Sequence, residues 1–177
     1  MNLITKKSKF TTIFALIISG EIIFSLPFHL TRYFRPTILE TFNLTNANIG
    51  DSFAVYGMTA MICYLPGGLI ADKFSVRLLM SFSLFATSIG GLFLLMIPNV
   101  IQLSVLYGYW GITSILFFWA ALIKATRIWG GELAQGRAFG LLDGGRGLVA
   151  AGFATLGVML FTFFLPDERD LINYHQR

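Results

Sequence analysis

Residues 78–123 read LLMSFSLFATSIGGLFLLMIPNVIQLSVLYGYWGITSILFFWAALI and contain no Asp, Glu, Lys or Arg. A helix of roughly 20 apolar residues crosses a bilayer core about 30 Å thick, so this stretch is long enough for two crossings. Pro98 and Asn99 lie near its middle, where the chain is expected to turn. The stretch predicts a helical membrane protein.

The composition agrees with this prediction. Hydrophobic residues make up 55% of the chain and charged residues 12%, against about 25% charged in soluble domains. The net charge of +4 comes from basic residues near the ends of apolar segments, which indicates membrane topology rather than nucleic-acid binding. We find no Ser-His-Asp set, metal cluster or phosphate-binding glycine loop, and expect neither an enzyme nor a bound cofactor or metal. Cys63 is the single cysteine, which excludes an internal disulfide.

The pattern predicts an all-α polytopic bundle that forms a single transmembrane domain over residues 1–177. Five spans are expected at about 10–32, 50–71, 77–97, 100–126 and 138–165, before a polar tail at 166–177. The first is interpreted as an uncleaved membrane helix rather than a signal peptide, because Glu21 interrupts its apolar run. The excess of Lys and Arg in alternate loops places the N-terminus inside and the C-terminus outside a bacterial cytoplasmic (inner) membrane.

A loop motif lies between the second and third expected spans, where residues 68–77 read GLIADKFSVR. It resembles the cytoplasmic loop motif of the major facilitator superfamily, although Ser75 stands where Gly is usual and Val76 where a basic residue is usual. The resemblance implies that Asp72 is the acid of a conformational latch and Arg77 its basic companion. A plain polar turn that follows the positive-inside rule is the alternative. The candidate gating residues are Gly68, Asp72, Lys73 and Arg77.

A second segment, after the fourth span, is similar to an inner loop of the organic-anion branches of that superfamily, including organophosphate and hexuronate-type permeases. The Pro that usually follows the Trp of that loop is absent. An interfacial Trp with snorkelling cations explains the same composition. The matching residues are Lys124, Arg127, Trp129, Arg137 and Gly140.

Taken together, the two resemblances imply a proton-coupled secondary transporter, a symporter, of a small anionic metabolite. They also imply that the chain is truncated after five of twelve helices. Alone in the bilayer it is expected to be inactive, with the missing C-terminal half as a separate chain or absent. The alternative is a small helical accessory or assembly subunit without a transport site.

Charged residues inside the expected spans are the candidates for substrate or proton contact. Glu21 lies within the first span, where desolvation favours a protonated carboxyl, and a structural hydrogen bond is the alternative. Asp143 and Arg146 are three residues apart, so they share a helix face and can pair. Arg32, at the outer end of the first span, is a further candidate for anion contact.

Two patterns of side-chain size bear on packing. Aromatic residues crowd the fourth span, where we expect mainly lipid-facing and interfacial roles. Small residues form a stripe on the fifth span, which predicts close packing against another helix. That helix is expected in the absent half, with the first or third span as alternatives. The stripe comprises Gly140, Gly144, Gly147, Ala151 and Ala154.

Overall fold

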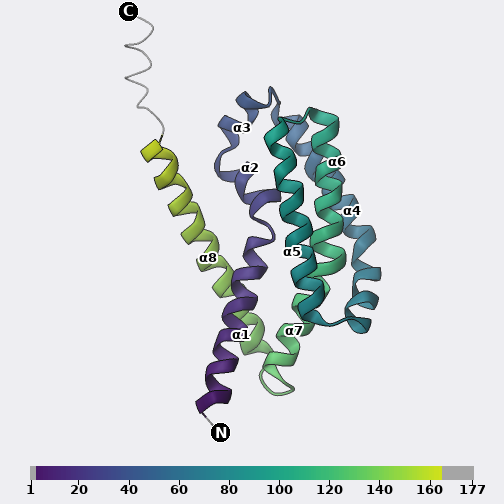
Figure 1. Cartoon of the computed structure of the whole chain (residues 1–177), viewed down its shortest axis with the longest axis vertical. Helices are drawn as coiled ribbons and strands as arrows, with labels where there is room; N and C mark the ends of the chain where they lie inside the picture. Colours follow the sequence, from purple (N-terminus) through teal and green to yellow (C-terminus); the bar gives the residue numbers. More distant parts are fainter. Residues whose placement is uncertain (1–2, 165–177) are drawn as a thin grey trace, which may run out of the picture.

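The computed structural model describes residues 3–164, and within that part the chain forms helices and no strand. Figure 1 shows these elements in chain order. They are α1 (Leu3–Ile22), η1 (Ser25–His29), α2 (Leu30–Tyr33), α3 (Arg35–Thr41), α4 (Asn46–Lys73), α5 (Val76–Phe93), η2 (Leu94–Met96), α6 (Val100–Gly111), η3 (Ile112–Trp119), α7 (Ala120–Gly130) and α8 (Gln135–Phe164).

Five segments are long and apolar enough to cross a bilayer, which confirms the predicted all-α membrane bundle. The chain is therefore an integral membrane protein. The segments are Lys9–Tyr33, Asn46–Lys73, Val76–Met96, Val100–Gly130 and Gln135–Phe163. Each contains most of one predicted span. The predicted polar tail at 166–177 lies outside the described residues.

Pairs of polar side chains set the starts of two of the helices, α4 and α6. Thr45 caps α4 and exchanges bonds with Asn48, three residues on. Asn99 and Gln102 form the same reciprocal arrangement at the start of α6. These capping boxes satisfy backbone N–H groups that a helix start leaves without partners. The predicted turn at Pro98 and Asn99 is confirmed, because α6 begins directly after it.

Two of the membrane-spanning segments contain π-helical turns. In η1 the N–H of His29 bonds to the carbonyl of Phe24, five residues back. Pro27 lies within this turn and has no N–H to donate. In η3 the widened turn coincides with a side-chain bond to the backbone, since the hydroxyl of Ser83 donates to the carbonyl of Thr113 over 2.6 Å. Such turns are rare and recur at functional sites.

The aromatic residues of the fourth span correct the prediction of mainly lipid-facing roles. Tyr107, Trp110 and Phe118 are fully buried in the two apolar clusters of the bundle. Polar bonds hold two of them in place: the Tyr107 hydroxyl donates to the carbonyl of Pro27 over 2.7 Å, and the Trp110 indole to that of Thr87 over 3.0 Å. Aromatic side chains with a satisfied polar group suit such positions.

Helix α8 differs from the rest of the bundle. Figure 1 shows its first half beside α1 and α7 and its second half diverging from α1. The second half still contacts Phe34, through Gly157 and through the ring of Phe161, whose centre lies 5.0 Å from that of Phe34. Within its candidate span, none of the most apolar window is buried. The contact between α1 and α8 is close at Gly145, where an added Cβ would meet Ile17. This contact brings the charged residues of the two helices together.

Candidate functional site

Glu21 forms the centre of a charged cluster near the middle of the first span. Its side chain is only 7% exposed. One carboxylate oxygen, Oε2, lies 3.2 Å from Nε of Arg146 in α8, and the other, Oε1, lies 3.1 Å from Nε2 of His29 in η1. The two predicted candidates Glu21 and Arg146 are therefore brought together from opposite ends of the sequence.

The guanidinium of Arg146 is held from several directions. Its Nε also donates to the carbonyl of Gly20 over 3.1 Å, and Nη1 lies 3.5 Å from Oδ1 of Asp143. Its Cζ lies 5.6 Å from the ring centre of Phe24 and 5.5 Å from that of Trp119, both within the range of cation–π attraction. The side chain is 19% exposed, so Arg146 is anchored but accessible.

His29 completes the cluster. Its ring packs edge-on against Tyr33, and within the described residues its buried Nδ1 has no hydrogen-bond partner. His29 thus has one nitrogen on Glu21 and a second, buried nitrogen without a hydrogen-bond partner among the described residues. With a neutral imidazole, the two carboxylates of Glu21 and Asp143 outnumber the single Arg146 cation. With a charged imidazole the cluster is neutral.

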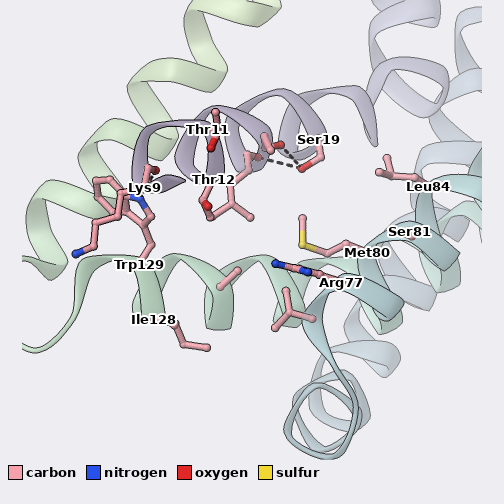
Figure 2. A pocket seen from close by; sticks show the side chains of 14 residues that line it. Lys9, Thr11, Thr12, Ser19, Arg77, Met80, Ser81, Leu84, Ile128 and Trp129 are labelled. Atoms are coloured by element: carbon pink, nitrogen blue, oxygen red, sulfur yellow. Dashed lines mark hydrogen bonds between the residues drawn. The ribbon is translucent and has the colours of Figure 1, made fainter. Parts of the chain in front are cut away.

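The candidate gating motif places its residues on two sides of the bundle. The cation nearest Asp72 is Lys124, whose Nζ lies 3.9 Å from Oδ1 and donates to the carbonyl of Ala71 over 2.7 Å. Arg77 instead lines a cavity of about 660 Å³ between α1, α5 and α7, together with Met80. Figure 2 shows Arg77 beside Met80 in this cavity. Gly68 lines the cavity that contains Asp72, and Lys73 is exposed at the end of α4.

The second motif is spread along α7 and the start of α8. Lys124 and Arg127 line one cavity, of about 590 Å³. The Trp129 indole donates to the carbonyl of Lys9 over 2.7 Å, tying α7 to α1, as Figure 2 shows at one end of the other cavity. Arg137 and Gly140 are exposed on α8.

Two predicted features lie away from the charged cluster. Arg32 is exposed on α2 and does not contact Glu21 or Arg146 within the described chain. The small-residue stripe faces open space: a Cβ at Gly140, Gly144 or Gly147 would meet nothing within 4 Å, and Ala151 is exposed. The glycine that packs on α1 is Gly145, one position from the stripe.

The sequence did not assign His29 to this cluster. In a regular α-helix, a residue eight positions along is rotated by about 80° from the first. The extra residue held in η1 brings His29 back to the side of Glu21. Trp119 was likewise not assigned to a site. No group of three or more residues able to hold a metal ion occurs in the part of the chain described.

Comparison with known proteins gives relatives of similar sequence in bacterial membranes. The chain is 30% identical to the inner membrane protein YqcE of Escherichia coli over 85% of its length, and 32% identical to the inner membrane protein YihN of the same organism over 92%. It covers 35% and 38% of those two proteins, so it spans little more than a third of either. No family model and no solved structure matches the chain.

These comparisons contradict the assignment to the major facilitator superfamily. The relatives are named as inner membrane proteins and not as members of that superfamily, and no family model matches. The motifs were incomplete at Ser75 and Val76 and lacked the expected Pro after Trp129. Short basic loops with an interfacial Trp arise in many polytopic proteins from the positive-inside rule alone. The site residues therefore have to be interpreted from their geometry.

Proposed function

We propose that the chain contributes to a secondary active transporter of a small anionic metabolite, with Glu21, His29 and Arg146 at its substrate and proton site. The observation that carries the proposal is the Glu21–Arg146 ion pair near the middle of two candidate spans. On insertion scales, placing a charged side chain at the membrane centre costs roughly 2.5 to 3.5 kcal/mol of free energy. Such residues persist mainly where they line substrate or ion pathways.

The proposed coupling follows from competition for Arg146. A substrate carboxylate or phosphate needs the guanidinium donors, one of which Glu21 now occupies. A proton on Glu21 removes the competing charge, and His29, 3.1 Å from the other carboxylate oxygen, is the neighbouring group that can exchange that proton. Proton binding and anion binding then favour each other reciprocally, as coupled transport requires. Asp143 keeps Arg146 in position during the exchange.

The bacterial cytoplasmic membrane, with the N-terminus inside, is the location we propose. The names of YqcE and YihN support an inner membrane. Figure 1 places the start of α1, the α4–α5 connection and α7 at one end of the bundle. The basic residues of these segments favour that end as the cytoplasmic one. They include Lys9, Lys73, Arg77, Lys124 and Arg127.

Additional helices form part of the proposal. An α8 span whose most apolar window is unburied has room for a partner on its open face, on the same or a separate chain. The same observation favours a second candidate function, an accessory or assembly subunit that binds another membrane protein through α8. The two differ in what they require of Arg146: only the transporter needs its positive charge for activity.

A direct test uses the protein encoded by the complete locus, reconstituted in liposomes. Uptake of a panel of organic anions, including sugar phosphates, uronates and small carboxylates, is measured with an inward proton gradient. Uptake that an Arg146→Gln variant abolishes and an Arg137→Gln variant retains is the expected result. If no anion enters, or if Arg146→Gln transports normally, the proposal fails and the accessory role becomes the better account.

A further inference from the structure

A second cation-lined cavity lies near the charged cluster, between α4, the end of η3 and α7. It has a volume of about 590 Å³. Its polar groups are Tyr64, Asp72, Lys124 and Arg127, and much of its remaining wall is apolar. Asp72 and Arg127 lie in the last turns of α4 and α7, and Lys124 lies one turn before Arg127, on the side of the bundle where basic residues collect. The cavity is therefore a basic, partly apolar hollow at one mouth of the bundle.

The charges in this cavity do not cancel. Lys124 is partly engaged, because its ammonium donates to the carbonyl of Ala71 and lies 3.9 Å from Asp72. Arg127 is exposed, and among the described residues its guanidinium has no ion-pair partner. One carboxylate thus faces two cations. The excess positive charge favours an anion, and a free guanidinium can bind a phosphate or carboxylate through two donors.

Trp119 links this cavity to the charged cluster. Its side chain lines the cavity, and the centre of its ring lies 5.5 Å from Cζ of Arg146. The ring also packs edge-on against Phe24 of the first span. A molecule in the cavity would therefore touch the same aromatic ring that Arg146 touches, which makes Trp119 the partition between the two positions.

We propose that this cavity is a second anion subsite, which holds an organic anion with an apolar or aromatic body before or after it reaches Arg146. Arg127 and Lys124 bind the charged group, and Trp119 and Tyr64 pack against the body. The inference rests on the proposed transport function, since it assigns the subsite to the same path. It adds four residues with roles distinct from those of Glu21 and His29.

The test measures the charge preference of the cavity without measuring transport. Cys63 is replaced by Ser and Ala120, a small residue of the cavity wall, by Cys in the full chain in lipid nanodiscs. The new thiol is modified by methanethiosulfonates that carry either a negative sulfonate or a positive trimethylammonium. Relative to a free thiol in solution, we expect the negative reagent to be favoured. Ile123→Cys, also in the wall, serves if the Ala120 variant elutes as an aggregate.

Removal of one cation should lower this preference. In the protein with Cys63→Ser and Ala120→Cys, Arg127→Gln is expected to reduce the ratio of the two rates by roughly two- to tenfold. The two reagents differ by two unit charges, so the ratio responds to twice the potential of the removed cation, and dissolved salt screens that potential. Arg137→Gln, which removes an exposed cation outside the cavity wall, is the matched control. An equal effect of both variants, or no effect of Arg127→Gln, would overturn the assignment.

Ligand protection completes the test, with phenyl phosphate as the probe. We expect phenyl phosphate to slow labelling more than inorganic phosphate, which lacks the ring, or phenol, which lacks the charge. Equal protection by phenol overturns the role of the cations, and equal protection by inorganic phosphate overturns that of Trp119 and Tyr64. Protection from labelling without any anion uptake would support the subsite and refute the transport proposal. Anion uptake without protection from labelling would refute the subsite alone.

Discussion

The Nε atom of Arg146 lies 3.2 Å from Oε2 of Glu21, joining the fifth span of the protein to the first. Both side chains are largely removed from solvent, at 19% and 7% exposure. A buried cation or anion destabilises the fold when its partner is absent, because its charge is then buried without compensation. Arg146 and Glu21 each remove this cost for the other. The relationship makes the contact between α1 and α8 depend on charge as well as on the fit of Gly145 against Ile17.

Replacing either partner should destabilise the protein. Glu21→Gln or Arg146→Gln is expected to cost about 3 kcal/mol, the lower end of the range for a broken buried ion pair. The double variant should lose much less than the sum of the two, because it leaves no buried charge of the pair uncompensated, and Asp143, which also loses Arg146, is 69% exposed. Unfolding by sodium dodecyl sulfate in mixed micelles measures these differences. Arg137→Gln, on the exposed surface of α8, is the control and should change stability by less than about 0.5 kcal/mol. Strictly additive losses of stability for Glu21→Gln and Arg146→Gln would argue against the coupling.

The pH dependence of anion uptake should depend on Glu21. If the carboxylate competes with substrate for Arg146, acidification releases the guanidinium, so wild-type uptake should rise as pH falls. Glu21→Gln has no carboxylate to protonate and should give a flatter pH profile, with exchange of substrate across the membrane retained. His29, Asp143 and Arg146 are the ionisable neighbours that this experiment leaves in place. An unchanged profile in Glu21→Gln would remove Glu21 from the coupling.

Adjacent glycines of α4 should respond in opposite directions to the same substitution. A Cβ at Gly67 would lie 3.0 Å from the carbonyl oxygen of Leu116 and 3.2 Å from that of Ile115, so Gly67→Ala should force α4 from η3 and cost about 1 to 3 kcal/mol. A Cβ at Gly68 meets nothing within 4 Å, and Gly68→Ala should be neutral or stabilise the helix by up to about 1 kcal/mol. Thermal unfolding of both variants in one detergent checks the order, which a reversed ranking would refute.

The hydroxyl of Tyr107 should contribute to the packing of α6 on η1. It donates to the carbonyl of Pro27 over 2.7 Å and lies 3.2 Å from the hydroxyl of Thr31. Tyr107→Phe removes these bonds and should lower the free energy of unfolding by about 1 kcal/mol. Tyr64→Phe, at an exposed position of α4, provides the control and should be without effect on stability. Similar values for the two variants would mean that the buried hydroxyl makes no net contribution.

The Asp72–Lys124 pair should matter little for stability. The two charged atoms lie 3.9 Å apart, and the Asp72 side chain is 81% exposed. Exposed ion pairs are typically worth less than about 1 kcal/mol, so Asp72→Asn should unfold almost as the wild type does. A gating role for Asp72 would then appear only as altered transport kinetics in a protein of unchanged stability. A large loss of stability would instead indicate a structural role.

Local sequence signals predicted the fold well because each acts over a few residues. The apolar runs, the turn at Pro98 and the caps at Thr45 and Asn99 need only their neighbours to take effect. The charged cluster was predicted only in part: the pairing of Asp143 with Arg146 follows from helix spacing. The partner of Glu21 does not, because Arg146 is 125 residues away along the chain.

The burial of individual aromatic residues in the fourth span is a second feature that the sequence did not predict. Nothing in the sequence of the fourth span distinguishes Trp110, which is fully buried, from Tyr109, which is 36% exposed. The Trp110 indole donates to the backbone carbonyl of Thr87 in α5, and the hydroxyls of Ser83 and Thr87 bond to Thr113 in η3. A contact of this kind depends on the packing of α5 against η3, which the sequence pattern of either helix alone does not specify.

The π-helical segment Ile112–Trp119 sets the phase of everything that follows it in the fourth span. Each residue of an α-helix turns the chain by about 100°. A wide turn that holds one more residue therefore rotates all later side chains about the helix axis, relative to a regular helix. Deleting a single residue from this segment would leave a span long enough to cross the bilayer, yet would swing Lys124 and Arg127 away from Asp72 and Tyr64. The direction of the α7 cations therefore depends on the number of residues in this segment. Insertion or deletion of one uncharged residue there would redirect them while leaving the charge of the chain unchanged.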